Sequence, residues 1–334
     1  MSSVRDGSPP PTVPLGAGVE FDTIRRFLAH GRAPHPSVAV GPGDDAAVFE
    51  GGWVLSTDLT VEDVHFRRGW ASPEEIGGRA VLAALSDLAG MAARPVGVLA
   101  SVAFPQEPDD AYAEAVMAGV CGAADAWDAP LIGGDLSRSP GPLVLDIVVV
   151  GQAESPCLRA GSVAGDRIWV TGALGSSAAA VRTWEAGREP SPELREAFLR
   201  PTPRISVALA LAAGGRIHAM LDLSDGLAGD AGHLAAAGDL RAVIEIERIP
   251  VSEAARVALG EEVALEMALH GGEDYELCFT TASELPAADL EAAGVRLTCV
   301  GRMEQGKGVW VQSPGGELRQ VTRGGFDHFA GQGG

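Results

Sequence analysis

Residues 53–104 read WVLSTDLTVEDVHFRRGWASPEEIGGRAVLAALSDLAGMAARPVGVLASVAF and contain one strand–helix–strand unit. A strand is expected at 53–57. The tetrapeptide SPEE at 72–75 is a capping box with proline at the first helical position, so a helix should begin there and run to about residue 92. The apolar stretch 96–104 is expected to be a second, longer strand. This order of elements predicts an α/β architecture.

The sequence on either side of this unit completes a first αβ domain, which we place at residues 19–154. Apolar residues recur at helical spacing over 19–30. The other expected elements are a strand at 38–40, a helix at about 109–126, a short strand at 131–132 and a strand in the apolar run 143–150. Residues 1–18 are rich in Pro, Ser and Gly and are expected to be a disordered leader.

A second αβ pattern follows, which we place at residues 155–330. A strand at 167–171 leads through a glycine-rich turn, 172–177, into a helix at 178–186. Further strands are expected at 220–223, 242–246, 275–280 and 297–300, separated by alanine-rich helices. A chain of 334 residues also exceeds the usual size of one compact core. The predicted fold class is therefore α/β (α+β) with two domains.

The net charge and the cysteine pattern argue against some classes of partner and cellular location. Asp and Glu number 45 against 25 Lys and Arg, a net charge of −20, which argues against a nucleic-acid or membrane partner. Four scattered cysteines without a CxxC pair are expected to be reduced thiols. We find no export signal and no apolar run of about 18 residues. A cytoplasmic protein is expected.

Lysine is almost absent from the chain, and Lys307 is its only copy. A Walker A loop and a protein-kinase site each require a lysine at a defined position. Lys307 lies in a Gly-flanked turn near the end of the sequence. Both of these phosphate-binding arrangements are therefore excluded.

Aspartates recur beside the predicted strands. They occur in Gly43-Asp44-Asp45, Ser56-Thr57-Asp58, Gly133-Gly134-Asp135 and Asp222-Leu223-Ser224-Asp225, with Asp87 inside a helix. Strand ends in α/β proteins face the crevice that binds ligands. Two unit charges about 4 Å apart repel by roughly 4 kcal/mol at an effective dielectric near 20, so clustered carboxylates must be protonated or bound to metal. Oxygen donors without Cys or His favour Mg²⁺, which commonly shares phosphate oxygens.

Each motif taken alone also has a simple structural interpretation. A Gly-Asp pair is often a turn or a helix cap, and Asp87 can face solvent. The turn 172–177 opens a helix and can either hold an anion or merely connect strand to helix. An isolated histidine such as His65 is more often structural than functional. The segment 271–276 also reads as an ordinary turn.

Taken in order, eight motifs resemble those of the thiamine-monophosphate kinase family. They are GPGDDAAVF, STDLTVEDVHF, LSDLAGM, IGGDLSRS, RAGSVAGDRIWVTGALGSSAAA, DLSDGLAGDAGHL, GGEDYELCFT and FDHF, and together they span about 19–329. The wider superfamily includes aminoimidazole-ribonucleotide synthetase, selenophosphate synthetase and a hydrogenase-maturation protein. The resemblance implies a ferredoxin-like N-terminal αβ domain whose sheet pairs with its twin across a homodimer, followed by a C-terminal α/β domain.

The resemblance also implies an activity: direct in-line transfer of the γ-phosphoryl group of ATP to thiamine monophosphate, giving thiamine diphosphate. The acceptor is itself a phosphate with a second pKa near ~6, so it is largely anionic at neutral pH and needs no strong general base. The barrier is the repulsion between two anions. Several Mg²⁺ ions that bridge and align the phosphates would lower it.

Matching motifs imply roles for single residues. The implied magnesium ligands are Asp45, Ser56, Thr57, Asp58, Asp87, Asp135, Asp222 and Asp225, of which Asp58 and Asp135 are expected to be catalytic. The implied ATP contacts are Gly134, Asp135, Arg159 and Ser224. The implied thiamine-phosphate contacts are His65, Glu273 and Phe326, the last through ring packing.

Three positions depart from the family pattern, and two alternatives to the activity stay open. Leu59 and Leu136 stand where many relatives carry a small polar residue, and Ala118 stands where an aromatic residue near adenine is expected. One alternative is another ATP-dependent member of the superfamily; selenophosphate synthetase is disfavoured because no cysteine precedes Cys121. The other is a non-catalytic metal- or nucleotide-binding protein.

Overall fold

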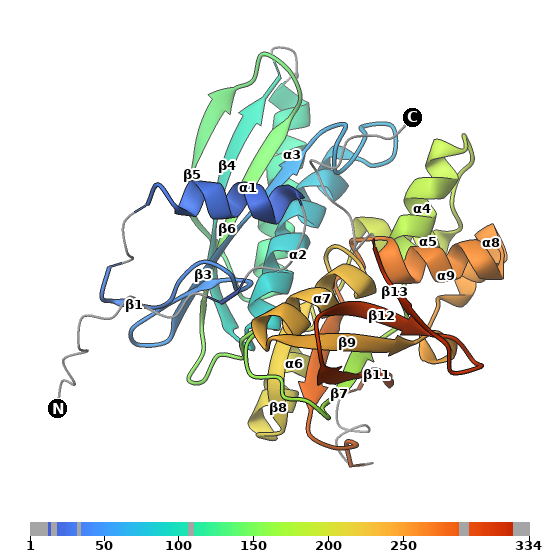
Figure 1. The fold of residues 1–334 in the computed structure, drawn as a ribbon. Coiled ribbons are helices and arrows are strands. Elements are labelled where there is room, and N and C mark those ends of the chain that lie inside the picture. Colours follow the sequence, from blue (N-terminus) through green and yellow to red (C-terminus); the bar gives the residue numbers. More distant parts are fainter. Residues whose placement is uncertain (1–12, 15–18, 32–34, 106–109, 287–293, 323–334) are drawn as a thin grey trace.

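Two sheets organise the chain. The structure is a computed structural model that describes residues 13–14, 19–31, 35–105, 110–286 and 294–322. Within these residues, strands between 38 and 152 form the first sheet and strands between 167 and 320 form the second (Figure 1). The predicted two-domain α/β fold is confirmed. The predicted boundaries at residues 19, 155 and 330 stay predictions.

The first sheet has six strands in the order β1-β2-β3-β6-β4-β5. They are β1 (Val38–Val40), β2 (Ala47–Phe49), β3 (Trp53–Val61), β6 (Val144–Gln152), β4 (Arg94–Phe104) and β5 (Leu131–Arg138). Neighbouring strands are antiparallel except β4 and β5. Helices α2 (Pro73–Gly90) and α3 (Asp110–Ala126) cover one face (Figure 1). The predicted capping box opens α2: Ser72 Oγ accepts from Glu75 N, and the Glu75 carboxylate accepts from Ser72 N.

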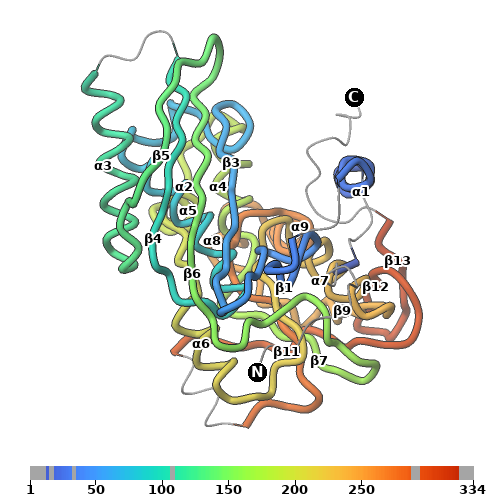
Figure 2. The backbone as a smooth tube through the Cα atoms, turned by 90° about the vertical axis from the view of Figure 1, so that its left-hand side faces the viewer, coloured from blue at the N-terminus to red at the C-terminus, as the bar shows by residue number. Residues whose placement is uncertain are grey.

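The opposite face of this sheet carries no described helix and is turned toward the viewer in Figure 2. The register puts Leu55, Thr57 and Leu59 of β3 on this face, opposite Val150, Val148 and Asp146 of β6. Leu59 is 51% exposed. A sheet face that leaves apolar residues such as Leu59 open to solvent is typical of a surface that another molecule covers.

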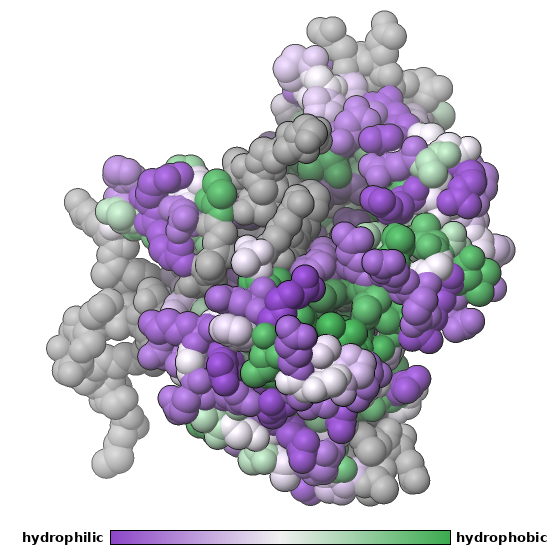
Figure 3. Space-filling model, turned by 45° about the vertical axis from the view of Figure 1, so that its right-hand side comes forward, coloured by the Kyte–Doolittle hydropathy of each residue, from purple (hydrophilic) through white to green (hydrophobic). Residues whose placement is uncertain are grey.

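The second sheet has seven strands in the order β13-β12-β9-β11-β7-β10-β8. They are β7 (Arg167–Thr171), β8 (Ile217–Asp222), β9 (Leu240–Glu245), β10 (Leu277–Thr281), β11 (Leu297–Gln305), β12 (Gly308–Gln312) and β13 (Leu318–Gln320). One face packs against α4 (Ser176–Glu185), α5 (Pro192–Leu199), α7 (Leu227–Ala237), α8 (Glu253–Leu259) and α9 (Glu261–His270). The surface on this side is mainly hydrophilic, with apolar residues gathered in a recess (Figure 3).

The other face of the second sheet belongs to the core of the first domain. Trp169, Met220 and Phe279 lie in one apolar cluster with α2 and the first sheet, and α6 (Ile205–Ala213) also packs there. The remaining helices are α1 (Val19–Leu28), which meets α7 through the Phe21 and His233 rings, and the short 3-10 helix η1 (Ile246–Arg248). A shared core fixes the orientation of the two domains, so residues from both can form one site.

Several predicted strands differ in length from the observed ones, and two of these differences concern site motifs. Asp58 lies inside β3 rather than at its end, because β3 stays paired with β6 as far as Val61. Gly134 and Asp135 lie inside β5, which was expected to end at residue 132. Two glycines give little strand propensity, and the parallel ladder with β4 holds this segment extended. No helix in the described part of the chain is long and apolar enough to cross a membrane.

Candidate active site

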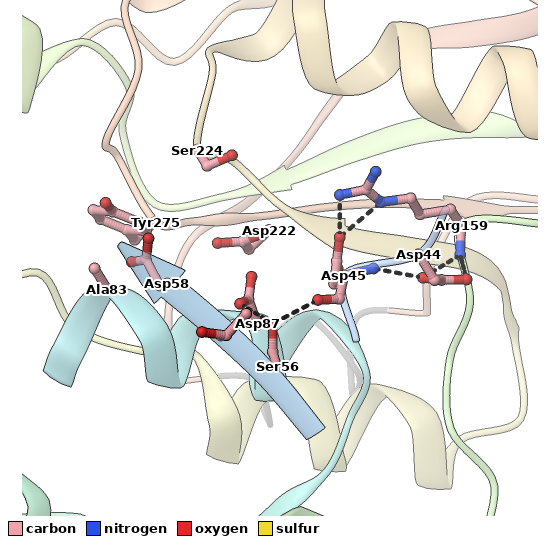
Figure 4. Close-up of a pocket in the computed structure, with 11 residues that line it drawn as sticks. Asp44, Asp45, Ser56, Asp58, Ala83, Asp87, Arg159, Asp222, Ser224 and Tyr275 are labelled. Atoms are coloured by element: carbon pink, nitrogen blue, oxygen red, sulfur yellow. Dashed lines mark hydrogen bonds and ion pairs between the residues drawn. The ribbon is translucent and has the colours of Figure 1, made fainter. Parts of the chain in front are cut away.

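An acidic pocket of about 240 Å³ lies where the two domains meet (Figure 4). Its lining combines five carboxylates, the hydroxyl groups of two serines and one tyrosine, and one guanidinium. The lining residues are Asp44, Asp45, Ser56, Thr57, Asp58, Ala83, Asp87, Arg159, Asp222, Ser224 and Tyr275. The predicted oxygen-rich cluster is therefore assembled from segments that lie far apart in the sequence.

Strand β3 and helix α2 supply the centre of the pocket. Ser56 and Asp58 point from β3 toward α2, because alternate strand residues share a face. Ser56 Oγ lies 2.6 Å from Oδ2 of Asp87 and 2.9 Å from the carbonyl oxygen of Asp45. One hydroxyl proton serves only one acceptor. Both contacts are satisfied when Asp87 is protonated and donates to Ser56.

The end of α2 lets carboxylates from both domains approach each other. A Cβ atom added at Gly90 would lie 2.1 Å from Oδ2 of Asp45 and 3.1 Å from the backbone nitrogen of Asp222. Any larger residue at this position would push the two chains apart. Asp45 Oδ2 is buried and has no hydrogen-bond partner among the described residues. A buried carboxylate oxygen without a donor suits a cation.

Burial and mutual repulsion shift the acidity of the pocket. Burial raises the pKa of Asp58 to about 6. Burial, reinforced by Asp45, raises the pKa of Asp44 and of Asp222 to about 7. Burial and then the charges of Asp222, Asp45 and Asp58 raise the pKa of Asp87 well above its usual value. The ligand-free pocket therefore holds protons near neutral pH, and a divalent cation would displace them.

Among the described residues, Arg159 carries the only positive charge that lines the pocket. Its Nε and Nη2 atoms donate to Asp45 Oδ1 at 2.7 and 2.6 Å (Figure 4). Its backbone nitrogen donates to the carboxylate of Asp44, at 3.2 and 3.1 Å from the two oxygens. This arginine therefore holds the loop that follows β1 beside the second domain, and it presents a cation at one end of the pocket.

The structure places the predicted site residues in two groups. It brings together Asp45, Ser56, Asp58, Asp87, Arg159, Asp222 and Ser224 around the pocket. Thr57 also lines the pocket, but its hydroxyl lies on the opposite face of β3, where it donates to Asp146 Oδ1 at 2.5 Å. Gly134 and Asp135 instead lie exposed on the edge strand β5. Three strand spacings, roughly 14 Å in all, separate β5 from β3. Asp135 and Asp58 of one chain therefore do not reach a common ion in this arrangement.

Four further predicted residues lie outside the pocket lining or the described chain. Asp225 forms a group with Asp230 and His233 whose potential ligand atoms lie within 4.8 Å of one another, so this group can hold a cation. His65 Nδ1 accepts from Val61 N at 3.0 Å and closes a turn. Glu273 pairs with a buried arginine of α2. Phe326 lies outside the described residues.

The glycine-rich turn 172–177 does not offer an open anion site. Gly175 N donates to Asp274 Oδ2 at 2.7 Å, and the amides of Ser176 and Ser177 also favour the ionised form of that carboxylate. Burial nevertheless raises the pKa of Asp274 to about 8. The carboxyl group of Asp274 therefore occupies the start of α4, and the turn serves as a strand-to-helix connection.

Sequence reasoning missed three residues of this region. Asp44 lines the pocket beside the predicted Asp45, and its place in the Gly43-Asp44-Asp45 motif was the available signal. Tyr275 lines the opposite end, in a backbone conformation with φ of 51° that is rare for a tyrosine. Arg79, which meets Glu273, carried no signal because its partner is 194 positions away.

Comparisons with known proteins agree on one family. The model for the N-terminal domain of AIR synthase related proteins matches residues 43–153, and the model for their C-terminal domain matches 163–312. A thiamine-monophosphate kinase of Rhodopirellula baltica is 36% identical over 322 residues, covering 90% of this chain and 96% of the relative. One of Escherichia coli K12 is 35% identical over 327 residues, covering 93% and 98%.

Solved structures of the same family are also similar to this chain. AaThiL complexed with AMPPCP and TMP has a TM-score of 0.78 at 30% identity, covering 92% of this chain and 96% of that one. A thiamine-monophosphate kinase from Stenotrophomonas maltophilia has a TM-score of 0.72 at 36% identity, covering 89% and 96%. The hydrogenase maturation protein HypE in complex with ATP, at 19% identity and a TM-score of 0.71, shares the fold.

Proposed function

The chain belongs to the thiamine-monophosphate kinase family, and we propose that it transfers the γ-phosphoryl group of ATP directly to thiamine monophosphate, in line and without a phosphoenzyme. The family assignment made from the eight sequence motifs is confirmed. The observation that carries the proposal is the pocket, in which carboxylates of both domains and one arginine surround a single space. Phosphoryl transfer needs little more than positioning and charge stabilisation.

We further propose that several Mg²⁺ ions bind in this pocket. The donors fit: all are oxygen atoms, Asp45 Oδ2 lacks a partner among the described residues, and burial disfavours the ionised carboxylates when no cation is present. The residues that would hold magnesium are Asp45, Ser56, Thr57, Asp58, Asp87 and Asp222 at the pocket, with Asp135 and Asp225 outside it. When bound, the ions would neutralise and bridge the phosphates of both substrates.

The protein's own groups would then hold and align the two phosphates. Arg159, which pairs with Asp45, is suited to bind a phosphate of ATP through its planar fork. Ser224 also lines the pocket and can donate a hydroxyl proton to the nucleotide. No side chain need act as a strong base, because the acceptor oxygen is already anionic at neutral pH. The absence of a phosphate-binding lysine agrees with this division of roles.

We infer that ATP and acceptor occupy opposite ends of the pocket. Arg159 and Asp45 define the nucleotide end, whereas Asp58 and Tyr275 define the acceptor end, where Glu273 also lies close enough to raise the pKa of Asp58. Glu273, His65 and Phe326 are the thiamine contacts that the family resemblance implies. They stay part of the proposal, with His65 having a structural hydrogen bond as well.

We propose a homodimer that pairs the uncovered faces of two first sheets. Leu59 on that face is 51% exposed, and the register places Asp135, Ser101 and Asp146 in one row across it. Within one chain, Gly134 and Asp135 lie far from the pocket. Their proposed contact with ATP would therefore be made from this face. A partner subunit would provide the surface that these two residues lack. We also propose a cytoplasmic enzyme without a nucleic-acid or membrane partner.

The test is product analysis with purified protein. Magnesium and ATP are incubated with thiamine monophosphate, with free thiamine, or with no acceptor. The proposal predicts one thiamine diphosphate formed per ATP consumed, with thiamine monophosphate as the acceptor. ATP consumption without phosphorylated thiamine would favour another superfamily activity, and binding of ATP without turnover would favour a non-catalytic protein.

A further inference from the structure

Arg79 is a buried arginine of α2 beside the acceptor end of the pocket. Its side chain is 3% exposed. Its Nη1 atom donates to the carbonyl oxygen of Phe198 at 2.6 Å, and its Nη2 atom donates to Oε1 of Glu273. The guanidinium also lies over the ring of Phe198, 4.0 Å from its centre. A cation this deeply buried requires partners, and both of them belong to the second domain.

Glu273 is held in one orientation by its backbone as well. Its φ of 69° is rare for a glutamate, and its nitrogen donates to the carbonyl oxygen of Ser224 at 2.8 Å. A Cβ atom added at the preceding Gly272 would lie 2.3 Å from that same oxygen, so the two segments run in close contact. Ser224 lines the pocket, and Glu273 is therefore tied to the pocket wall.

The ion pair leaves one carboxylate oxygen of Glu273 for a ligand. Arg79 binds Oε1, and among the described residues Oε2 has no partner. The Glu273 side chain is 25% exposed, so part of it is open to a ligand. The guanidinium also opposes the rise in the pKa of Asp58 that burial causes, which places it within electrostatic reach of the pocket. Arg79 thus influences both acidic groups at the acceptor end.

We propose that Arg79 is a positioning residue for the acceptor, acting through Glu273: it fixes Oε1 and aims Oε2 at an amino group or ring cation of the bound molecule. This inference rests on the proposed function. Thiamine monophosphate carries an aminopyrimidine and a cationic thiazolium ring in addition to its phosphate. A carboxylate held by an arginine offers the oxygen that such groups require, without leaving an unpaired charge buried when the site is empty.

The chain offers a matched control in Arg195. Its guanidinium binds both oxygens of Glu75 on α2, at 2.8 and 2.7 Å, so it also joins the two domains by an arginine–glutamate pair. Neither Arg195 nor Glu75 lines the pocket. A role limited to holding the domains together predicts similar consequences for Arg79→Met and Arg195→Met. A role in acceptor positioning predicts a difference between them.

The experiment measures steady-state kinetics and equilibrium binding of thiamine monophosphate for wild type, Arg79→Met, Arg79→Lys, Arg195→Met, Glu273→Gln and the double variant Arg79→Met/Glu273→Gln. We expect Arg79→Met to raise KM and Kd for thiamine monophosphate by about tenfold or more while KM for ATP changes less than about twofold. Arg195→Met should leave both KM values near wild type. Arg79→Lys should recover part of the loss, and the double variant should resemble Glu273→Gln alone.

Several results would overturn the role of Arg79. They are wild-type affinity for thiamine monophosphate in Arg79→Met, equal losses for both substrates, or additive losses in the double variant. A melting temperature measured for each variant identifies any that fail to fold, and Arg79→Lys then provides the decisive comparison. Wild-type protein that neither binds nor phosphorylates thiamine monophosphate would overturn the proposed function, and this inference with it.

Discussion

Replacing Asp58 by asparagine should stabilise the ligand-free protein and abolish its activity. Asp58 lies inside β3 in a pocket crowded with carboxylates. Burial raises its pKa from 3.8 to about 6. The ionised group therefore destabilises the empty fold, and an uncharged amide of nearly the same shape removes that effect. Losing a proposed magnesium ligand should reduce turnover to background.

The magnitude follows from the pKa difference. A shift of roughly two units at ~1.4 kcal/mol each corresponds to about 3 kcal/mol at pH 8. This figure is an upper limit, because Asp58 is partly exposed and water screens its charge. Since the folded-state pKa is the higher one, the stability is fully present below about pH 3.8 and is lost as pH rises through about 6. The gain in free energy of unfolding from Asp58→Asn should therefore be roughly half as large at pH 5 as at pH 8.

The assay is thermal unfolding of wild type and Asp58→Asn in EDTA at pH 5 and pH 8, and again with magnesium and ATP. Asp125→Asn, which alters an exposed carboxylate on α3, is the control. In EDTA at pH 8 the Asp58→Asn melting temperature should be higher by a few degrees. Magnesium and ATP should stabilise wild type more than the variant, so that wild type then has the higher melting temperature.

Three outcomes would refute this reasoning. The first is an Asp58→Asn protein no more stable than wild type at pH 8. The second is an advantage that does not change with pH, since a packing effect rather than a charge effect would then explain it. The third is near-normal turnover in the variant, which would remove Asp58 from the catalytic site.

Three other predictions concern different parts of the molecule. Arg159→Met should raise KM for ATP at least about tenfold, with little change in KM for thiamine monophosphate; equal changes would contradict its assignment to the nucleotide end. Asp274→Ala should lower the free energy of unfolding by about 1 kcal/mol, because Gly175 N loses its acceptor at the start of α4; an unchanged denaturation midpoint would oppose this. Leu59→Glu should yield monomers in sedimentation at micromolar concentration, where wild type is expected to be dimeric; a dimeric variant would place the interface elsewhere.

Local signals predicted the framework of both domains. The capping box at Ser72 and Glu75 located the start of α2, which in turn places Asp87 opposite β3. Asp222 lies at the end of β8, as its sequence context indicated. Such features depend on residues that are neighbours in the chain, so they can be recognised in a single sequence.

Other features depend on pairing between segments far apart in the sequence, and no local sequence pattern predicts them. The glycines before Asp135 suggested a strand end, yet the ladder with β4 extends β5 to Arg138. The capture of the α4 amides by Asp274, and the pairing of Arg79 with Glu273, join residues 99 and 194 positions apart. Because these contacts form only when segments far apart in the sequence pack together, sequence spacing does not report them.

The most direct test of the central claim is to locate the metal ions. Crystals of the protein grown with Mn²⁺ and an unreactive ATP analogue would reveal each ion by its anomalous scattering. Two or more ions bound by Asp45, Asp58, Asp87 or Asp222 and in contact with the phosphates are predicted. Phosphates bound without any ion at these carboxylates would contradict the account.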